Sequence, residues 1–199
     1  MKNHKYLYAI TLAFFALSLV NIHFALLGVI CMAIPFYLLQ RDTKKTWCQN
    51  YCPRSSLYMT LGRKRKKKGK VTPMSFIKGR LKYAVLVYFG ISLSIAVMST
   101  VQVALGNMPP MLIPRFMIIL PISSGFPQLV TLTGIPLWIT HLAFRMFSMM
   151  MTTTIIGLTL SYVYKPRTWC TICPINTISD IYIMENRKRQ SPGIQKKAS

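Results

Sequence analysis

Long apolar stretches alternate with strongly basic segments along this chain, and that alternation constrains its fold more than any other feature. The chain has 25 Lys and Arg against 3 Asp and Glu, which gives a net charge of +22. Most of the basic residues lie in 41–82 and 165–197, and the stretches between them are apolar and long enough to cross a bilayer. Basic segments kept on the cytoplasmic side are typical of membrane proteins. The sequence therefore predicts an all-α, multi-pass protein of a prokaryotic cytoplasmic membrane, with the lipid bilayer as its first partner.

The scarcity of carboxylates excludes several kinds of chemistry. Asp42, Asp180 and Glu185 are the only carboxylate side chains in the sequence. They supply neither the acid pair of a glycoside hydrolase nor the acidic cage of a calcium or two-metal site. A Gly-rich phosphate loop is also missing from the sequence. The basic run at 63–70 has no aromatic residues between its charges for base stacking, so we expect no nucleic-acid partner.

The apolar stretches predict about four transmembrane helices with both termini in the cytoplasm. The expected helices cover about residues 6–20, 24–40, 81–105 and 141–164. The first two come from one apolar run, 6–39, which as a single helix would reach about 50 Å, well beyond a hydrocarbon core of about 30 Å. Asn21-Ile22-His23 is the natural turn within that run.

The region 107–140 is apolar but is interrupted by several prolines and glycines. One more crossing here would place the two cysteine-bearing segments on opposite sides of the bilayer. We therefore predict a proline-broken re-entrant or interfacial segment, which is tolerated where protein or water satisfies its backbone. Residues 41–80 are expected to form a polar, basic loop. On this interpretation 1–184 is a single transmembrane domain, and 185–199 is a disordered basic tail.

Two near-identical cysteine motifs are the strongest internal signal. The first reads Lys45-Thr46-Trp47-Cys48-x₃-Cys52-Pro53, and the second reads Arg167-Thr168-Trp169-Cys170-x₂-Cys173-Pro174. Each motif follows the inner end of an even-numbered predicted helix. A repeat of this detail implies two matching half-sites that meet on one side of the membrane.

Four cysteines in two such pairs indicate a metal centre. Thiolates two or three residues apart can chelate one centre, and four of them complete a tetrahedral iron or zinc site or hold an iron–sulfur cluster. Mononuclear iron, [2Fe–2S] and [4Fe–4S] all fit this donor set, and the basic surroundings would stabilise the thiolates. The predicted ligands are Cys48, Cys52, Cys170 and Cys173. Pro53 and Pro174 would turn the chain away from the site, and Trp47 and Trp169 would either shield it from water or anchor the chain at the membrane interface.

Two other interpretations of the cysteines stay open. Trp-Cys-x-x-Cys is also similar to the motif of thiol–disulfide oxidoreductases, but no βαβ pattern surrounds it, and disulfides are disfavoured on the cytoplasmic side. The site could instead be a structural metal site in a non-redox membrane assembly or maturation factor. Cys31 stands alone inside an apolar helix, where a free cysteine usually packs as a small hydrophobic residue.

His141 and Arg145 lie four residues apart and share one face of the last predicted helix. An arginine within a membrane-spanning segment suggests function by default. Beside the proline-broken segment, these residues could border a quinone pocket. The alternative interpretation is a structural pairing of Arg145 with backbone carbonyl groups.

At the paired motifs the chain resembles a family of polytopic membrane 4Fe-4S binding proteins with Cys-x-x-x-Cys-Pro motifs, the NapH/NosR-type quinol dehydrogenase membrane components of nitrate and nitrous-oxide respiration. The resemblance implies a [4Fe–4S] cluster as cofactor. It also implies electron transfer between the quinone pool and a redox partner, by a subunit rather than a stand-alone enzyme.

Two features depart from the pattern of that family. The second motif is one residue shorter, and no cysteine follows Cys173, whereas many relatives carry further ferredoxin-like runs. The onward carrier would then be a soluble or membrane redox partner with clusters of its own.

Overall fold

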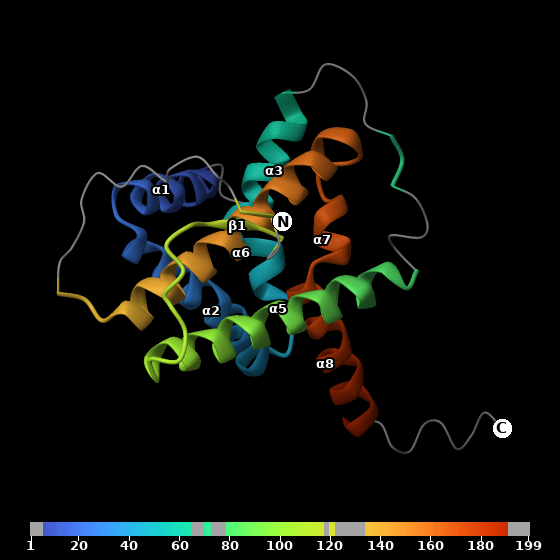
Figure 1. The fold of residues 1–199 in the computed structure, drawn as a ribbon. Coiled ribbons are helices and arrows are strands. Elements are labelled where there is room, and N and C mark those ends of the chain that lie inside the picture. The colour runs from blue at the N-terminus through green and yellow to red at the C-terminus, as the bar shows by residue number, and fades with distance from the viewer. Residues whose placement is uncertain (1–5, 65–69, 73–78, 118–119, 122–133, 191–199) are drawn as a thin grey trace, which may run out of the picture.

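The computed structural model describes residues 6–64, 70–72, 79–117, 120–121 and 134–190. These residues are mostly helical, and one short hairpin is the only sheet among them (Figure 1). Helix α6 (Leu137–Val163) runs through the middle of the molecule, and α3 (Pro53–Lys64), α5 (Leu81–Ala104) and α7 (Thr168–Ile172) all pack against it. The candidate site is therefore assembled around one long helix.

Three helical segments are long and apolar enough to cross a membrane. They are Ile22–Asp42, Leu81–Ala104 and Leu137–Val163. The first combines the 3₁₀ helix η1 (Ile22–Leu26) with α2 (Leu27–Asp42). Helix α1 (Leu7–Val20) is apolar but has only 14 residues, about 21 Å of helix, which is shorter than a hydrocarbon core of about 30 Å. The described part of the chain thus contains three candidate spans, and a fourth crossing by α1 stays a prediction.

Asn21 separates α1 from η1, at the turn predicted within the first apolar run. Its backbone is extended (φ −148°, ψ 126°), so the helix ends there. Its side-chain Oδ1 accepts a hydrogen bond of 2.9 Å from the backbone N–H of His23, which satisfies one donor at the start of η1. The helix that follows packs its apolar face on α6. This core cluster consists of Ile22, Ala25, Ala143, Phe144 and Phe147.

The described part of the proline-broken segment is extended along α6. Three of its backbone N–H groups donate to side chains on one face of that helix. Met111 donates to His141 Nδ1 at 2.9 Å, Arg115 to Ser148 Oγ at 3.0 Å, and Met117 to Thr152 Oγ1 at 3.2 Å. Strand β1 (Arg115–Phe116) then pairs antiparallel with β2 (Leu120–Pro121), so the chain turns back. Residues 118–119 and 122–133 of the predicted segment lie outside the described residues. These hydrogen bonds explain how a segment without a helix satisfies its backbone beside apolar neighbours.

Helix α6 begins at Leu137, four residues before the predicted start, so the broken segment ends at Pro136. Proline is favoured at the edge of a helix because it lacks the N–H group that the first turn cannot pair. Helix α5 ends one residue before the predicted boundary of 105.

The expected loop at 41–80 was wrong for its first half, because residues 47–64 are helical. The π-helical turn η2 (Trp47–Tyr51) is followed by α3, whose Tyr58 is 1% exposed. The hydrophobic side chain of Tyr58 belongs to a core that the sequence alone does not reveal. Residues 65–69 and 73–78 lie outside the described part.

The expected boundary of the basic tail at 185 was also wrong. Helix α8 (Pro174–Gln190) includes the first six residues of the predicted tail. Arg187, Lys188 and Arg189 lie in its last turn, where positive charge is favoured by the helix dipole. Arg189 also pairs with Glu185 one turn earlier, at 3.6 Å. Residues 191–199 lie outside the described residues.

Candidate metal centre

The two cysteine motifs fold in the same way. The first cysteine of each lies within a single helical turn, Cys48 in η2 and Cys170 in α7. The second cysteine of each directly precedes a proline that begins a longer helix, Pro53 for α3 and Pro174 for α8. Proline is favoured at the first helical position, because its fixed φ suits a helix and its missing N–H would be unpaired there anyway. The Cys-Pro pair therefore starts a helix in each half, rather than only turning the chain away.

A π-helical turn absorbs the extra residue of the first motif. In η2 the backbone N–H of Cys52 donates to the carbonyl oxygen of Trp47, five residues earlier, at 3.0 Å. A π-helical turn holds one residue more than an α-helical turn. The second motif, one residue shorter, forms the α-helical turn α7 instead. The difference in motif length is thus a difference in turn type within a common design.

The site lies beside the middle of α6 rather than at its end. The buried cluster of Tyr58, Trp169 and Ile172 packs with residues 156–160 of α6. Cys173 lines a small cavity with Met149, Met150 and Thr153. The chain therefore turns at the end of α6 and runs back along it. Thr153 is ten residues before the end of α6, which corresponds to about 15 Å of helix.

Helix α3 starts at the site and runs alongside the second half of α6, in the same direction as α6. Arg54, in its first turn, donates from Nη1 to Thr153 Oγ1 at 3.0 Å. One turn later, Ser161 Oγ donates to the backbone oxygen of Tyr58 at 2.9 Å. Near its end, a Cβ on Gly62 would lie 2.3 Å from Pro166 Cγ. The start of α3 is thereby held against the middle of α6.

Several contacts join the two halves directly. Lys45 Nζ forms an ion pair with Asp180 Oδ1 of α8 at 2.5 Å. The Sγ of Cys170 lies 3.9 Å from Ser55 Oγ, the third residue of α3. In each contact, a residue of one motif meets a residue of the helix that follows the other motif. The segments that carry the two motifs therefore lie beside each other.

The thiols of both motifs are partly buried and influence one another electrostatically. Burial raises the pKa of the Cys48 thiol to about 12, and the neighbouring thiols of Cys173, Cys52 and Cys170 add to this shift. Burial also raises the pKa of Cys170 to about 12, with the thiols of Cys52 and Cys173 as further causes. The pKa of Cys173 is raised mainly by burial. All the described cysteines are free thiols.

Positive charge surrounds these thiols from both halves. Lys45 acts on Cys48, Arg167 on Cys170 and Arg54 on Cys173, and in each case the cation lowers the pKa of the thiol and partly offsets burial. The Cys173 thiol also accepts hydrogen bonds from the backbone N–H groups of Ile175 and Asn176 at the start of α8. Helix N-termini favour negative charge, and both α3 and α8 begin at the site.

Four thiols are a donor set for an iron–sulfur cluster or for a single tetrahedral metal ion. Among the described residues, no three His, Cys, Asp or Glu side chains converge closely enough to hold one metal ion. In a [4Fe–4S] cluster each thiolate binds a different iron atom, so the four sulfurs surround the cluster without meeting at a point. The surrounding cations would offset the negative charge of a thiolate-ligated cluster.

The predicted shielding residues lie around the thiols. Trp169 is 6% exposed and packs with Tyr58 and Ile172, so it is a core residue and not an interfacial anchor. Trp47 opens the π turn and is half-buried, while Pro53 and Pro174 begin the two helices. Cys31, in α2, lines a separate cavity together with Pro53 and Arg54.

The two residues predicted for a quinone pocket have different positions. Arg145 lines a cavity of about 420 Å³ between α5, α6 and the 111–117 segment. Trp169, Ile172 and Pro174 of the second motif line the same cavity. The His141 ring is instead engaged on both nitrogens, with Met111 N–H at 2.9 Å and Ser99 Oγ at 3.0 Å, and it supports the wall.

Sequence reasoning missed Arg54 and Arg115 as site residues. Arg54 follows the first Cys-Pro directly, and a helix beginning at Pro53 would have placed its guanidinium near the cysteines. Arg115 joins Arg145 at the large cavity because the 111–117 segment lies along α6. Arg115 and Arg145 are the only Lys or Arg residues between 83 and 164.

The comparisons with known proteins agree with the four-thiol site. The sequence model of the 4Fe-4S binding domain family matches the chain twice, over residues 24–71 and 143–192. Each match contains one cysteine motif with the helix before it and the helix after it. These matches support a 4Fe-4S binding protein. No curated protein and no solved structure gave a significant match.

Proposed function

We propose that this chain is a membrane-embedded electron-transfer protein in which Cys48, Cys52, Cys170 and Cys173 hold one [4Fe–4S] cluster. One observation carries the proposal: two repeated half-sites, each matched by the 4Fe-4S binding domain, bring their thiols together where α3 and α8 begin. When bound, such a cluster takes up and returns single electrons.

The chain's own residues would set the properties of that cluster. Lys45, Arg54 and Arg167 would offset its negative charge. Trp169 would exclude water from the side of the second motif, where it is almost fully buried. Burial with compensating charge keeps the redox centre insulated, and hydrogen bonds and solvent exposure tune its potential.

The membrane part of the proposal rests on the three apolar helices. Among the described residues, α5 and α6 are the only candidate spans between the end of α2 and the end of α6. If both cross, the two motifs return to the same side of the bilayer, whether or not α1 crosses. The basic segments next to the motifs favour the cytoplasmic side of a prokaryotic cytoplasmic membrane.

Quinone and a redox partner are the proposed electron donor and acceptor. The cavity of about 420 Å³ is mostly apolar and shares a wall with the second motif. A quinone there would lie close to Cys173, since Met149 and Thr153 line both this cavity and the small cavity beside that thiol. The proposed onward carrier is a soluble or membrane redox partner protein with clusters of its own.

Thiol–disulfide exchange is less compatible with the site. A reactive thiol needs a lowered pKa, because the thiolate is the nucleophile. Here burial raises the pKa of Cys48 and Cys170 to about 12. Metal ligation has no such conflict, since a metal displaces the thiol proton when it binds.

The proposal is tested with anaerobically purified protein in liposomes. Chemically reduced protein should show the EPR signal of a reduced cluster, and a short-chain quinone should abolish that signal by reoxidation. The Cys173→Ser variant serves as the cluster-free control. A colourless protein with stoichiometric zinc would overturn the cluster, and a cluster that does not react with quinone would overturn the quinone step alone.

A further inference from the structure

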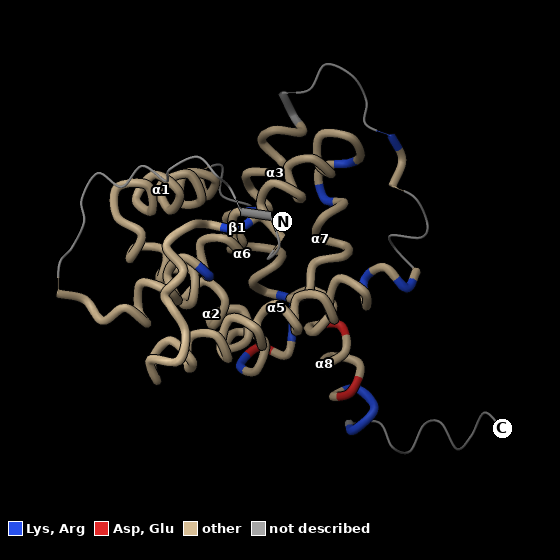
Figure 2. Tube along the Cα trace, viewed as in Figure 1, with Lys and Arg blue, Asp and Glu red and all other residues tan. Residues whose placement is uncertain are grey.

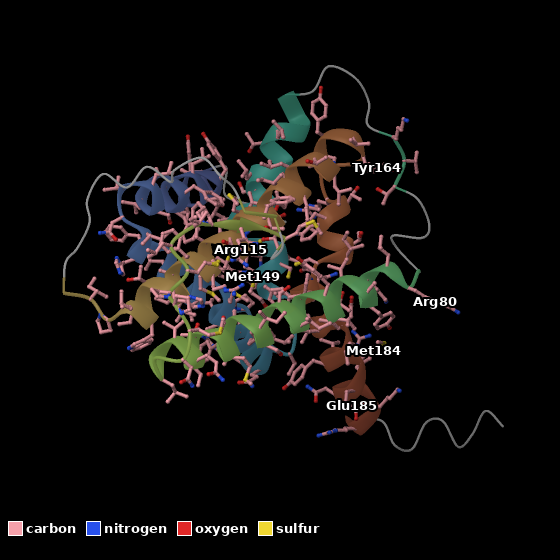
Figure 3. All side chains as sticks on the ribbon, in the orientation of Figure 1. Arg80, Arg115, Met149, Tyr164, Met184 and Glu185 are labelled. Carbon is pink, nitrogen blue, oxygen red and sulfur yellow. The ribbon has the colours of Figure 1, made fainter. Side chains whose placement is uncertain are left out.

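The large cavity is long and has a polar end and an apolar end. Its lining follows α6 from Arg145 to Leu160, fifteen residues or about 22 Å of helix. Arg115, Arg145 and Ser148 line one end, together with the methionines of the 111–117 segment. The side chains of Leu160 and Trp169 line the other. Figure 3 shows Arg115 and Met149 in the middle of the helical body, far from Arg80, Tyr164 and Glu185 at its ends.

The two arginines have no acidic partner within the chain. The sequence contains only three carboxylate side chains, and each pairs with a basic residue elsewhere: Asp42 with Arg41, Asp180 with Lys45, and Glu185 with Arg189. Figure 2 shows these acidic residues at α8 and near the end of α2, away from the segment labelled β1. The counter-charge for Arg115 and Arg145 must therefore come from outside the side chains of this protein.

The position of the arginines makes that missing charge costly. The Nε of Arg145 is buried and has no hydrogen-bond partner among the described residues. Arg115 acts on it as a second positive charge across the cavity. Arg145 is half-buried and Arg115 is exposed within the chain, so the cost falls on the buried Nε. A buried polar group without a partner is unfavourable, and a second cation nearby adds to that cost. An anion between the two guanidinium groups would remove both costs at once.

We propose that this cavity binds an anionic amphiphile, with its charged head on Arg115 and Arg145 and its apolar tail extending toward Trp169. A membrane lipid carrying a carboxylate or phosphate and the deprotonated form of a hydroxyquinone share this chemistry. The inference concerns the same cavity as the proposed function and rests on that function in this respect alone. Its test measures ligand binding and does not depend on electron transfer.

The test uses the three tryptophans and a matched pair of probes. The probes are 12-bromododecanoate and 12-bromododecan-1-ol, which share a tail and its bromine quencher but differ in the charge of the head. The holoprotein carries Trp138→Phe, because Trp138 is 41% exposed on the outer surface and would be quenched without specific binding. Adding Trp169→Phe to this variant should remove the quenching. That loss would show that the quencher lies beside Trp169 in the cavity.

We expect the acid to quench Trp169 at roughly tenfold lower concentration than the alcohol. The carboxylate can form charge-assisted hydrogen bonds with the arginines, which the alcohol cannot form. Arg115→Gln and Arg145→Gln should each remove this preference while leaving alcohol binding unchanged. Arg145→Lys should retain part of it. The comparison of acid and alcohol on the unaltered cavity needs no arginine variant, so it holds even if a variant fails to fold.

Competition then distinguishes the two sources of the ligand. Displacement of the brominated acid by phosphatidylglycerol identifies a lipid, and displacement by an alkylated 2-hydroxy-1,4-naphthoquinone identifies a redox ligand. Either result supports the proposal. Equal quenching by acid and alcohol, or full acid preference in both glutamine variants, would overturn it, whatever the EPR signal of the cluster shows.

Discussion

The phenolic oxygen of Tyr58 occupies the space beside Gly157 that a side chain would need. A Cβ built on Gly157 would lie 2.3 Å from that oxygen. Tyr58 is 1% exposed, and its hydroxyl donates to the backbone oxygen of Thr153 at 3.4 Å. This close contact lets α3 lie against α6, and Cys52, the second cysteine of the first motif, directly precedes α3. The geometry of the metal centre thus depends on a glycine that touches none of its ligands.

Gly157→Ala should therefore damage the site from a distance. The added methyl group would force α3 away from α6, at a cost of about 1–3 kcal/mol for an overpacked core. We expect a lower unfolding temperature and a faster loss of iron under a chelator. Gly90→Ala is the matched control, since a Cβ on Gly90 meets nothing within 4 Å. Equal behaviour of the two variants would contradict this packing role.

The π turn predicts an unusual tolerance to deletion. Removing Asn50 would give the first motif the Cys-x-x-Cys spacing of the second, which folds as an α-helical turn. We expect an α-helical turn to replace η2 and the cluster to assemble, with Asn50→Ala as the full-length control. Iron content after anaerobic purification is the measurement. Complete loss of iron in the deletion variant alone would show that the extra residue shapes the site itself.

The raised thiol pKa values predict how the metal-free protein responds to alkali. Burial raises the pKa of Cys48 from 9.0 to about 12, whereas in the unfolded chain this thiol ionises at its ordinary value. Above pH 9 the unfolded state therefore loses a proton that the folded state keeps, so stability is full below pH 9 and falls as the pH rises toward 12.

The expected loss is on the order of 1 kcal/mol per buried thiol between about pH 8 and pH 10. Unfolding of the metal-free protein in mixed detergent micelles at the two pH values measures it. Cys48→Ser should lose less stability than the parent protein over the same interval. Identical pH dependence in both proteins would show that burial does not raise the pKa of the Cys48 thiol in the folded state.

Arg54 should tune the potential of the centre. It acts electrostatically on Cys173 and is held by Thr153, and its guanidinium also contacts the sulfur of Met150. Replacing it with Gln removes a positive charge, which makes the addition of an electron harder. We expect a shift to lower potential of about 50 mV, on the order of 1 kcal/mol, in an EPR redox titration. Arg54→Lys should shift the potential less. An unchanged potential in Arg54→Gln would show that Arg54 does not influence the centre.

The sequence predicted the elements that depend on local patterns. Asn21 breaks the first apolar run because its side chain competes for the backbone, and the charge pattern around 81–105 marks a long helix. The paired motifs also predict that the cysteines form one group, and this stays a prediction. These are short-range or compositional signals, and each is visible in a few neighbouring residues.

The sequence could not reveal what depends on packing between distant segments. Tyr58 lies in the expected basic loop, and contacts with distant residues such as Gly157 and Ser161 make α3 a core helix. The position of the centre beside the middle of α6 depends on the chain turning back after Tyr164, which no motif encodes. Arg115 becomes a partner of Arg145 through hydrogen bonds from the backbone of the 111–117 segment, and backbone groups leave no trace in a residue pattern.

Iron and acid-labile sulfide per chain test the central claim most directly. The protein is purified anaerobically together with its Cys48→Ser and Cys31→Ser variants. Cys31, in α2, is the matched control. It lines a cavity with Pro53 of the first motif but is not among the four proposed ligands. The account predicts about four iron and four sulfide per chain, retained in Cys31→Ser and lost in Cys48→Ser. Zinc without sulfide in the parent protein, or full iron in Cys48→Ser, would contradict it.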